Sequence, residues 1–316
     1  HRAKLVVRPL RKRVIEAIAR RHLGEFGLAH IVPEKDRIES VPLAADEPVA
    51  GGALHGVDVR LNTEIAGAAV WSSPTIDEKR GIAYFPLGSP TFDMFGGDRL
   101  GHNLFGDSLV ALDLRTGKRL WHYQLVHHDI WDYDTQSAPL LVDLRRDGQM
   151  VPAVLIVNKT GLMFTFNRVT GKPIFDIEER PVPKSDVPGE QASPTQPFPV
   201  KPEPLTQNTI SRNNLYKGEP QHQSYCEHLV DDNNMKLGGP YMPIAFNQYS
   251  ISPPGPAGGI NFWGPSYDPE LHLFVSNTSN IFQPMRIIQR PDGSYANSGP
   301  LAGTRRFGDP DRKLLC

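Results

Sequence analysis

The chain contains 316 residues, with 34 Lys and Arg against 35 Asp and Glu and a formal net charge of −1. That balance excludes the basic surface expected of a nucleic-acid-binding domain, and a hydrophobic content of 39% argues against disorder. Its apolar runs are shorter than the roughly 20 residues of a membrane-spanning helix. The 30 prolines and 28 glycines have no collagen-like period, so they predict short strands joined by turns. Because the chain begins with His1 rather than Met, we expect a fragment of a longer protein.

Residues 1–68 differ from the rest and form an N-terminal segment that no pattern places firmly. Within it, Arg11–Leu23 spaces its apolar residues as a helix does, with basic residues on the other side, and Gly24 suits the helix end. We interpret this short helix as a solvated surface element. Binding to a membrane surface or to an anionic partner is the alternative.

From about Ala69 the pattern changes to short β-rich runs separated by Gly, Pro, Asp and Asn, which predicts an all-β domain over residues 69–316. The proline-rich stretch Pro181–Pro204 is predicted to be a stiff ordered loop, with a proline-recognition ligand as the alternative. Residues 206–248 and 291–316 carry few strand signals. The predicted strands are Ile82–Pro86, Ser108–Leu112, Leu120–Leu125, Ala153–Val157, Met163–Asn167 and Leu271–Ser276.

An internal repeat organises part of this domain. The pattern Asp-x-x-Thr-Gly-Lys-x-x-aromatic, which starts at Asp113, recurs with Asn167 in place of the aspartate, 54 residues later. Asp or Asn caps a tight turn, Gly supplies a positive φ, and the aromatic residue packs on a neighbouring strand. Two unrelated hairpins are the alternative, but repeated four-stranded sheets predict a β-propeller. With about 45–55 residues per blade, the chain holds too few blades to close a ring.

The densest polar cluster is His127–Asp134, with the sequence HHDIWDYD. Three carboxylates and two imidazoles in eight residues are costly to bury unless they are paired or functional. The residues alone leave three readings open: a metal site, a general base with supporting groups, or a hydrogen-bonded corner between blades. Adjacent His127 and His128 do not match a zinc signature.

Two other residues, Lys159 and Trp71, would be functional only if the fold places them beside other site residues or a ligand. Lys159 lies between two apolar strands in a hairpin, where a lysine is usually solvent-exposed, and it matters only if the fold brings it beside Asp132. Trp71 is either a blade-packing residue or a stacking floor for a planar ligand. No G-x-G-x-x-G opens a βαβ unit, which disfavours NAD. The spacing His222-x3-Cys226-x-His228 suggests only half of a metal site.

Longer strings identify the chain as similar to a known family. VWSSPTIDEKRGIAYFPLGSP and SLVALDLRTGKRLWHYQLVHHDIWDYD resemble the quinoprotein dehydrogenases that use pyrroloquinoline quinone (PQQ), in particular the membrane-type glucose and quinate/shikimate branch. VNKTGLMFTFNRVTGKPIFDIEERPVPKSDVPGE, GGINFWGPSYDP and RPDGSYANSGP continue the resemblance. It covers roughly residues 69–316.

The resemblance implies an eight-bladed β-propeller with PQQ on its axis beside a divalent cation, Ca²⁺ or Mg²⁺, of which this chain would form an incomplete ring. By position in the motifs, Asp132 matches the catalytic base and Lys159 the lysine that contacts the quinone. Trp71 matches the floor under the cofactor ring. Thr91 falls near the metal and the cofactor, and Asn261 lies in a Gly-Gly-x-Asn segment near the active site.

The implied reaction is oxidation of a sugar, polyol or cyclic alcohol. Asp132 would take the hydroxyl proton while hydride passes to PQQ, and the electrons would continue to a quinone or cytochrome. Ser89 stands where related alcohol dehydrogenases carry a metal-ligand asparagine, which favours the sugar and cyclitol branch. The family implies a periplasmic location, with membrane attachment through a missing N-terminal part, and we expect the isolated fragment to be inactive. The alternative, a non-catalytic propeller scaffold of the cell envelope, gives no reason to keep Trp71, Asp132 and Lys159.

Overall fold

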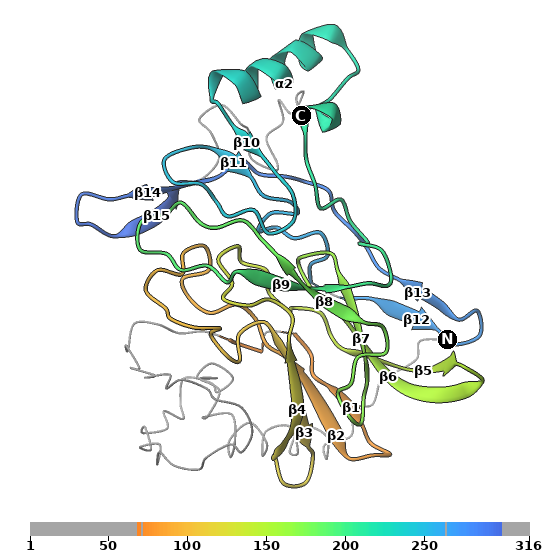
Figure 1. Ribbon diagram of the computed structural model, residues 1–316. Helices are drawn as coiled ribbons and strands as arrows, with labels where there is room; N and C mark the ends of the chain where they lie inside the picture. The colour runs from red at the N-terminus through yellow and green to blue at the C-terminus, as the bar shows by residue number, and fades with distance from the viewer. Residues whose placement is uncertain (1–67, 71, 263, 299–316) are drawn as a thin grey trace, which may run out of the picture.

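The computed structural model describes residues 68–70, 72–262 and 264–298 (Figure 1). The helix predicted at Arg11–Leu23 and the predicted site residue Trp71 therefore lie outside the described residues. Within the described part, strands dominate and the helices are η2 (Arg212–Asn214) and α2 (Pro220–Asp232). No helix there is both long enough and apolar enough to cross a membrane.

The first sheet is a four-stranded antiparallel meander in the order β1-β2-β3-β4. β2 and β3 are buried along nearly their whole length, as their continuous apolar runs predict for strands covered on both faces. Three of the predicted strands are confirmed here, one exactly and two within one residue at either end. The bounds are β1 (Thr75–Asp77), β2 (Ile82–Pro86), β3 (Ser108–Asp113) and β4 (Arg119–Gln124).

The second sheet repeats this meander with three strands, in the order β5-β6-β7. Where the first sheet has its fourth strand, beginning at Arg119, the repeat places Pro173, which forms only an isolated bridge to Phe166. Proline has no N–H to donate, so the ladder does not extend from that residue as a regular strand. The bounds are β5 (Leu140–Arg146), β6 (Gln149–Val157) and β7 (Met163–Asn167).

The repeated turns have the structure that their sequence predicts. Asp113 N–H donates to the Lys118 carbonyl at 2.8 Å, and Asn167 N–H donates to the Lys172 carbonyl at 2.8 Å. The side-chain oxygen of each capping residue also accepts a backbone N–H three residues later. Gly117 and Gly171 have φ angles of 72° and 71°, the left-handed conformation that glycine adopts without cost. The two turns are thus copies of one unit.

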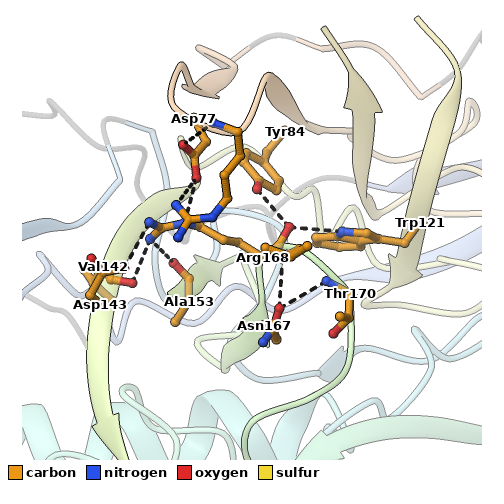
Figure 2. A network of polar contacts seen from close by, with 11 residues as sticks. Asp77, Tyr84, Trp121, Val142, Asp143, Ala153, Asn167, Arg168 and Thr170 are labelled. Carbon is orange, nitrogen blue, oxygen red and sulfur yellow. Dashed lines mark hydrogen bonds and ion pairs between the residues drawn. The ribbon is translucent and has the colours of Figure 1, made fainter. Parts of the chain in front are cut away.

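Arg168 joins the two sheets (Figure 2). Its guanidinium pairs with Asp77 of β1 at 2.9 Å and with Asp143 of β5 at 3.0 Å, and it donates to the Val142 carbonyl at 2.9 Å. Its own carbonyl accepts from the Tyr84 hydroxyl at 2.8 Å and from Trp121 Nε1 at 3.2 Å. One buried side chain therefore fixes the spacing between neighbouring sheets.

The core lies between these two sheets. Apolar side chains from β2, β3, β6 and β7 form one cluster, and the aromatic rings of Tyr84, Trp121, Tyr123, Phe164 and Phe166 meet within it. Aromatic pairs of this kind stabilise the fold by more than the burial of their apolar area alone. Because the core holds both sheets, the loop after β4 and the β6–β7 turn are positioned relative to each other.

The rest of the chain departs in part from the sequence expectations. Pro181–Pro204 is not a loop throughout, because its Thr195–Pro199 pairs with Ile177–Pro181 as a hairpin. The helix α2 was not predicted; Glu219 caps its N-terminus by accepting from two backbone N–H groups, and Pro220 suits its first turn. The remaining strands are β8 (Ile177–Pro181), β9 (Thr195–Pro199), β10 (Lys236–Leu237), β11 (Ser250–Ile251), β12 (Ser266–Asp268), β13 (Leu273–Val275), β14 (Arg286–Gln289) and β15 (Tyr295–Ser298). The predicted strand Leu271–Ser276 is shorter in the structure, where only the three residues of β13 are in strand conformation.

Candidate functional site

The loop that follows β4 carries the HHDIWDYD cluster and is anchored by its apolar residues. Ile130, Trp131 and Tyr133 are each buried, and the two aromatic rings stack with centroids 5.7 Å apart. Trp131 Nε1 donates to the Met242 carbonyl at 2.9 Å, and the Tyr133 hydroxyl donates to the Pro253 carbonyl at 2.9 Å. Because a distant segment holds the two aromatic residues, Asp132 between them is held in place as well.

Lys159 reaches this loop from the turn between β6 and β7. Its Nζ lies 2.8 Å from Asp132 Oδ1 and 2.8 Å from Asp134 Oδ2, and its N–H donates to the Asp134 carbonyl at 3.1 Å. The lysine is only 5% exposed, so the usual exposure of a hairpin lysine does not hold here. The condition that made it interesting, proximity to Asp132, is met.

The two carboxyls that share Lys159 differ in protonation. Burial raises the pKa of Asp132 to about 8, although Lys159 opposes this effect and Asp134 adds to it. The pKa of Asp134 is lowered, because Lys159 and the Ser89 N–H outweigh the opposing effect of burial. Lys159 itself has a raised pKa: burial opposes its charge, but the two aspartates outweigh that opposition. The group is thus an ionised Lys159–Asp134 pair beside a carboxyl that titrates near neutral pH.

Next to this pair lies a set of buried polar residues, Ser89, Asp107 and Asp129, whose mutual contacts the sequence did not predict. Ser89 Oγ donates to Asp129 Oδ2 at 2.6 Å and lies 3.4 Å from Asp107 Oδ1. Burial raises the pKa of Asp107 well above its ordinary value and that of Asp129 to about 6. No local pattern marks Asp107, which lies just before a strand and meets the cluster only in the fold.

Two further predicted residues lie on segments that contact this site. Thr91 is half-buried, two residues after Ser89, and the carbonyl of nearby Asp93 accepts from Asp132 N–H at 3.1 Å. Asn261 is also half-buried, and its Nδ2 donates to the Ala257 carbonyl at 2.7 Å, within its own loop. Trp71, the predicted floor, lies outside the described residues.

The loop that carries Asn261 approaches Lys159 through its glycines. Gly259 N–H donates to the Lys159 carbonyl at 2.8 Å. A Cβ added at Gly258 would lie 2.6 Å from Lys159 Cγ, so a larger residue would displace the lysine. The Gly-Gly pair therefore lets this loop close over the side of the site.

Polar side-chain atoms on the segments beside Lys159 have unused hydrogen-bonding capacity for a polar ligand, of which PQQ is one. Within the described part, buried side-chain atoms without a hydrogen-bond partner occur at residues 135–137 and 158, on both chain segments that frame Lys159. Such atoms are costly unless a ligand or water satisfies them. On these two segments the unpaired atoms are Thr135 Oγ1, Gln136 Oε1, Ser137 Oγ and Asn158 Nδ2, and others occur elsewhere in the described part.

Among the described residues, no group of three or more His, Cys, Asp or Glu side chains is arranged to hold an ion, and the carboxylates of Asp132 and Asp134 contact Lys159. The half-site on α2 is used otherwise, since the His222 ring stacks on Tyr216 at 4.0 Å and His228 Nδ1 contacts the Ser224 carbonyl at 2.7 Å. The metal role predicted for Thr91 therefore stays a prediction.

Comparison with known proteins places the chain in a family. Residues 50–310 match the family model described as "PQQ: Glucose/ethanol/alcohol dehydrogenase, beta-propeller domain". The chain belongs to this family, and the resemblance to PQQ-dependent quinoprotein dehydrogenases is confirmed. The β-propeller class is likewise confirmed, whereas the number of blades and the incomplete ring stay predictions.

The relatives that the chain matches include quinoprotein dehydrogenases with different substrates. The chain is 34% identical over 249 residues to the quinate/shikimate dehydrogenase (quinone) of Acinetobacter baylyi, covering 74% of this chain and 30% of that protein. It is 33% identical over 226 residues to the quinoprotein glucose dehydrogenase of Gluconobacter oxydans, covering 71% and 28%. Among solved structures, the quinohemoprotein alcohol dehydrogenase from Comamonas testosteroni matches with 22% identity and a TM-score of 0.46, over 70% of this chain and 27% of that one. The chain spans less than a third of the length of these relatives.

Proposed function

We propose that this chain supplies part of the active site of a PQQ-dependent dehydrogenase that oxidises a sugar, polyol or cyclic alcohol. Family membership and the names of the relatives support the reaction class. The observation that carries the proposal is the buried contact of Lys159 with Asp132 and Asp134, because it combines a titrating base and a fixed cation in one place.

Asp132 is the residue suited to take the hydroxyl proton of the alcohol. Its pKa of about 8 is close to neutral pH, where a general base works best. Its side chain is 19% exposed against 6% for Lys159, so the carboxyl is the more accessible partner. Lys159 stabilises the ionised form that must exist before the proton moves.

Lys159 keeps its charge through the proton transfer. When Asp132 is neutralised, Asp134 still pairs with Lys159 Nζ at 2.8 Å and holds the ammonium in the same position. Its Nζ is thus a permanent positive group at the place where an acceptor gains negative charge. When bound, PQQ supplies the electrophile that accepts hydride from the substrate carbon.

The other family-based assignments are part of the same proposal. Trp71 would stack on the cofactor ring, and Asn261 and Thr91 would contact it, with a Ca²⁺ or Mg²⁺ ion near Thr91. Residues 69–316 would form part of an eight-bladed propeller in the periplasm, with electrons leaving to a quinone or cytochrome. Membrane attachment would come through sequence outside this chain.

PQQ binding and turnover test the proposal separately. The protein is expressed from the complete reading frame that contains this chain, and PQQ binding is titrated with Ca²⁺ present. Dye reduction is then measured with glucose, quinate and glycerol. We expect saturable PQQ binding, PQQ-dependent dye reduction, and about tenfold or greater weakening of PQQ binding in Lys159→Met, because a charged hydrogen-bonding partner is lost. A protein that binds no PQQ and oxidises none of a wide panel of alcohols would instead fit the scaffold alternative.

A further inference from the structure

The backbone at Asp132 is in the left-handed conformation, which Asp adopts more readily than most residues with a side chain. Its φ angle is 65°, in the left-handed region that L-residues other than Gly, Asn and Asp seldom occupy. Neighbouring His128 also has a positive φ, of 46°. The backbone conformation at residue 132 sets the direction in which the Asp132 side chain leaves the chain, so contacts that hold this backbone also position the carboxyl.

The carboxylate of Asp129 accepts backbone N–H groups on either side of Asp132. Asp129 Oδ1 accepts the Trp131 N–H at 2.8 Å and Oδ2 accepts the Tyr133 N–H at 2.7 Å, so its two oxygens hold peptide groups on both sides of Asp132. Ser89 Oγ donates to the same Oδ2 at 2.6 Å. The Asp129 side chain is buried, with the residue 1% exposed, so water does not replace these bonds.

A second set of contacts fixes Asp129 itself. The buried Arg99 donates through Nη2 to the Asp129 carbonyl at 2.9 Å and to the carbonyls of Phe92 and Phe95 at 3.0 and 2.9 Å. The carbonyl of Asp93, which lies between Phe92 and Phe95 in the chain, accepts the Asp132 N–H. The loop is therefore held in two ways: the Asp129 side chain accepts from the loop's N–H groups, and Arg99 donates to the Asp129 carbonyl.

We propose that Asp129 is a positioning residue that sets the direction of the Asp132 side chain toward Lys159. This role rests on the proposed function, in which Asp132 is the base. Asp129 does not reach the reacting atoms; it acts by fixing the peptide groups at Trp131 and Tyr133 that flank Asp132.

Asparagine is the informative substitution because it keeps the size of the side chain and removes one acceptor. In Asp129→Asn, either Trp131 or Tyr133 would direct its N–H at an amide NH₂, which is itself a donor. Asp113→Asn is the matched control. Asp113 also accepts backbone N–H groups in a turn, at Arg115 and Thr116, and Asn already occupies the equivalent position 167 of the repeat.

The position of Asp132 is read first without any cofactor, through the reactivity of Lys159. Apo-protein from the complete reading frame is treated with limiting acetic anhydride, and the acetylation rate of Lys159 is compared with that of exposed Lys172 by mass spectrometry. In Asp129→Asn we expect the Lys159 rate to rise about tenfold relative to Lys172, the size of effect expected from one lost buried hydrogen bond. Asp113→Asn should leave the ratio unchanged.

Turnover gives the second readout. Per bound PQQ, kcat in Asp129→Asn should fall about 100-fold, as a misplaced catalytic group does, with PQQ affinity and Tm close to wild type. Ser89→Ala, which removes one of the three donors, should shift both readouts in the same direction by less. An unchanged Lys159 acetylation rate in both variants would overturn the positioning role. Failure of the wild-type protein to turn over with PQQ would overturn the proposed function instead, and would leave the acetylation result standing.

Discussion

Replacing Arg168 with methionine tests whether one buried side chain holds the two sheets together. Methionine keeps much of the apolar length and removes the charge, so Asp77 loses its contact at 2.9 Å and the carbonyls of Val142 and Ala153 lose their donor. Removing one partner of a buried ion pair costs about 3–5 kcal/mol. The contact with Asp143 adds little, because that carboxylate is 56% exposed.

The lower end of that range applies here, because Arg80 still pairs with Asp77 at 2.9 Å after the change. We therefore expect Arg168→Met to lower the free energy of unfolding by about 3 kcal/mol. Urea unfolding would show this as a lower midpoint with an unchanged m-value. Lys236→Met is the control: its pair with Asp186 is exposed, with 43% and 46% of the side chains accessible, so its loss should cost at most about 1 kcal/mol. Equal destabilisation by the two variants would refute the reasoning.

Two further predictions concern a repeat turn and a buried carboxyl. Gly171→Ala and Gly81→Ala both place alanine at a φ near 70°, but only the first puts a Cβ 2.7 Å from the Trp121 ring; urea unfolding should show a loss about 1–3 kcal/mol larger at Gly171, and equal losses would contradict the packing argument. Asp107 has a folded-state pKa raised by burial, so the folded state keeps a proton that the unfolded state releases above about pH 4. Stability from this group therefore falls as pH rises from about 4, and Asp107→Asn, which cannot ionise, should gain stability relative to wild type as the pH is raised above that point. A difference between the two proteins that stays constant with pH would show that Asp107 does not titrate in this way.

Local patterns in the sequence predicted the strands and turns well. Ile82–Pro86 and Met163–Asn167 form strands with the predicted bounds because continuous apolar runs between turn residues leave few alternatives. The repeated turns at Asp113 and Asn167 are copies, as the shared Thr-Gly-Lys pattern indicates. These features depend on neighbours in the chain, so they can be read without the fold.

Other features depend on distant residues or on competing local preferences. Thr195–Pro199 is a strand in spite of its prolines, because the pairing with Ile177–Pro181 outweighs a local preference for loop. The helix α2 has an apolar face too weak to stand out, and only Cys226 and Val230 are buried along it.

The candidate site likewise contains residues that local sequence motifs predict and residues that only the fold brings together. The HHDIWDYD string marks the segment that carries Asp132, and Lys159 gains a role only when the fold brings it beside that residue. That Lys159 is buried with two aspartates follows from the packing of two sheets, which no single motif encodes. Ser89 was noted only for its place in the family pattern, whereas its contacts with Asp107 and Asp129 come from the fold. Asp129 stands out from its neighbours only when its hydrogen bonds to Trp131 and Tyr133 are known.

The central claim is that Asp132 takes the substrate proton, and Asp132→Asn tests it most directly. Asparagine keeps the shape of the side chain and cannot act as a base at neutral pH. In the protein from the complete reading frame, loaded with PQQ and Ca²⁺, we predict that PQQ binding persists while kcat falls at least about 100-fold, the lower end of what general-base catalysis contributes. Unchanged turnover per bound PQQ in Asp132→Asn would contradict the account.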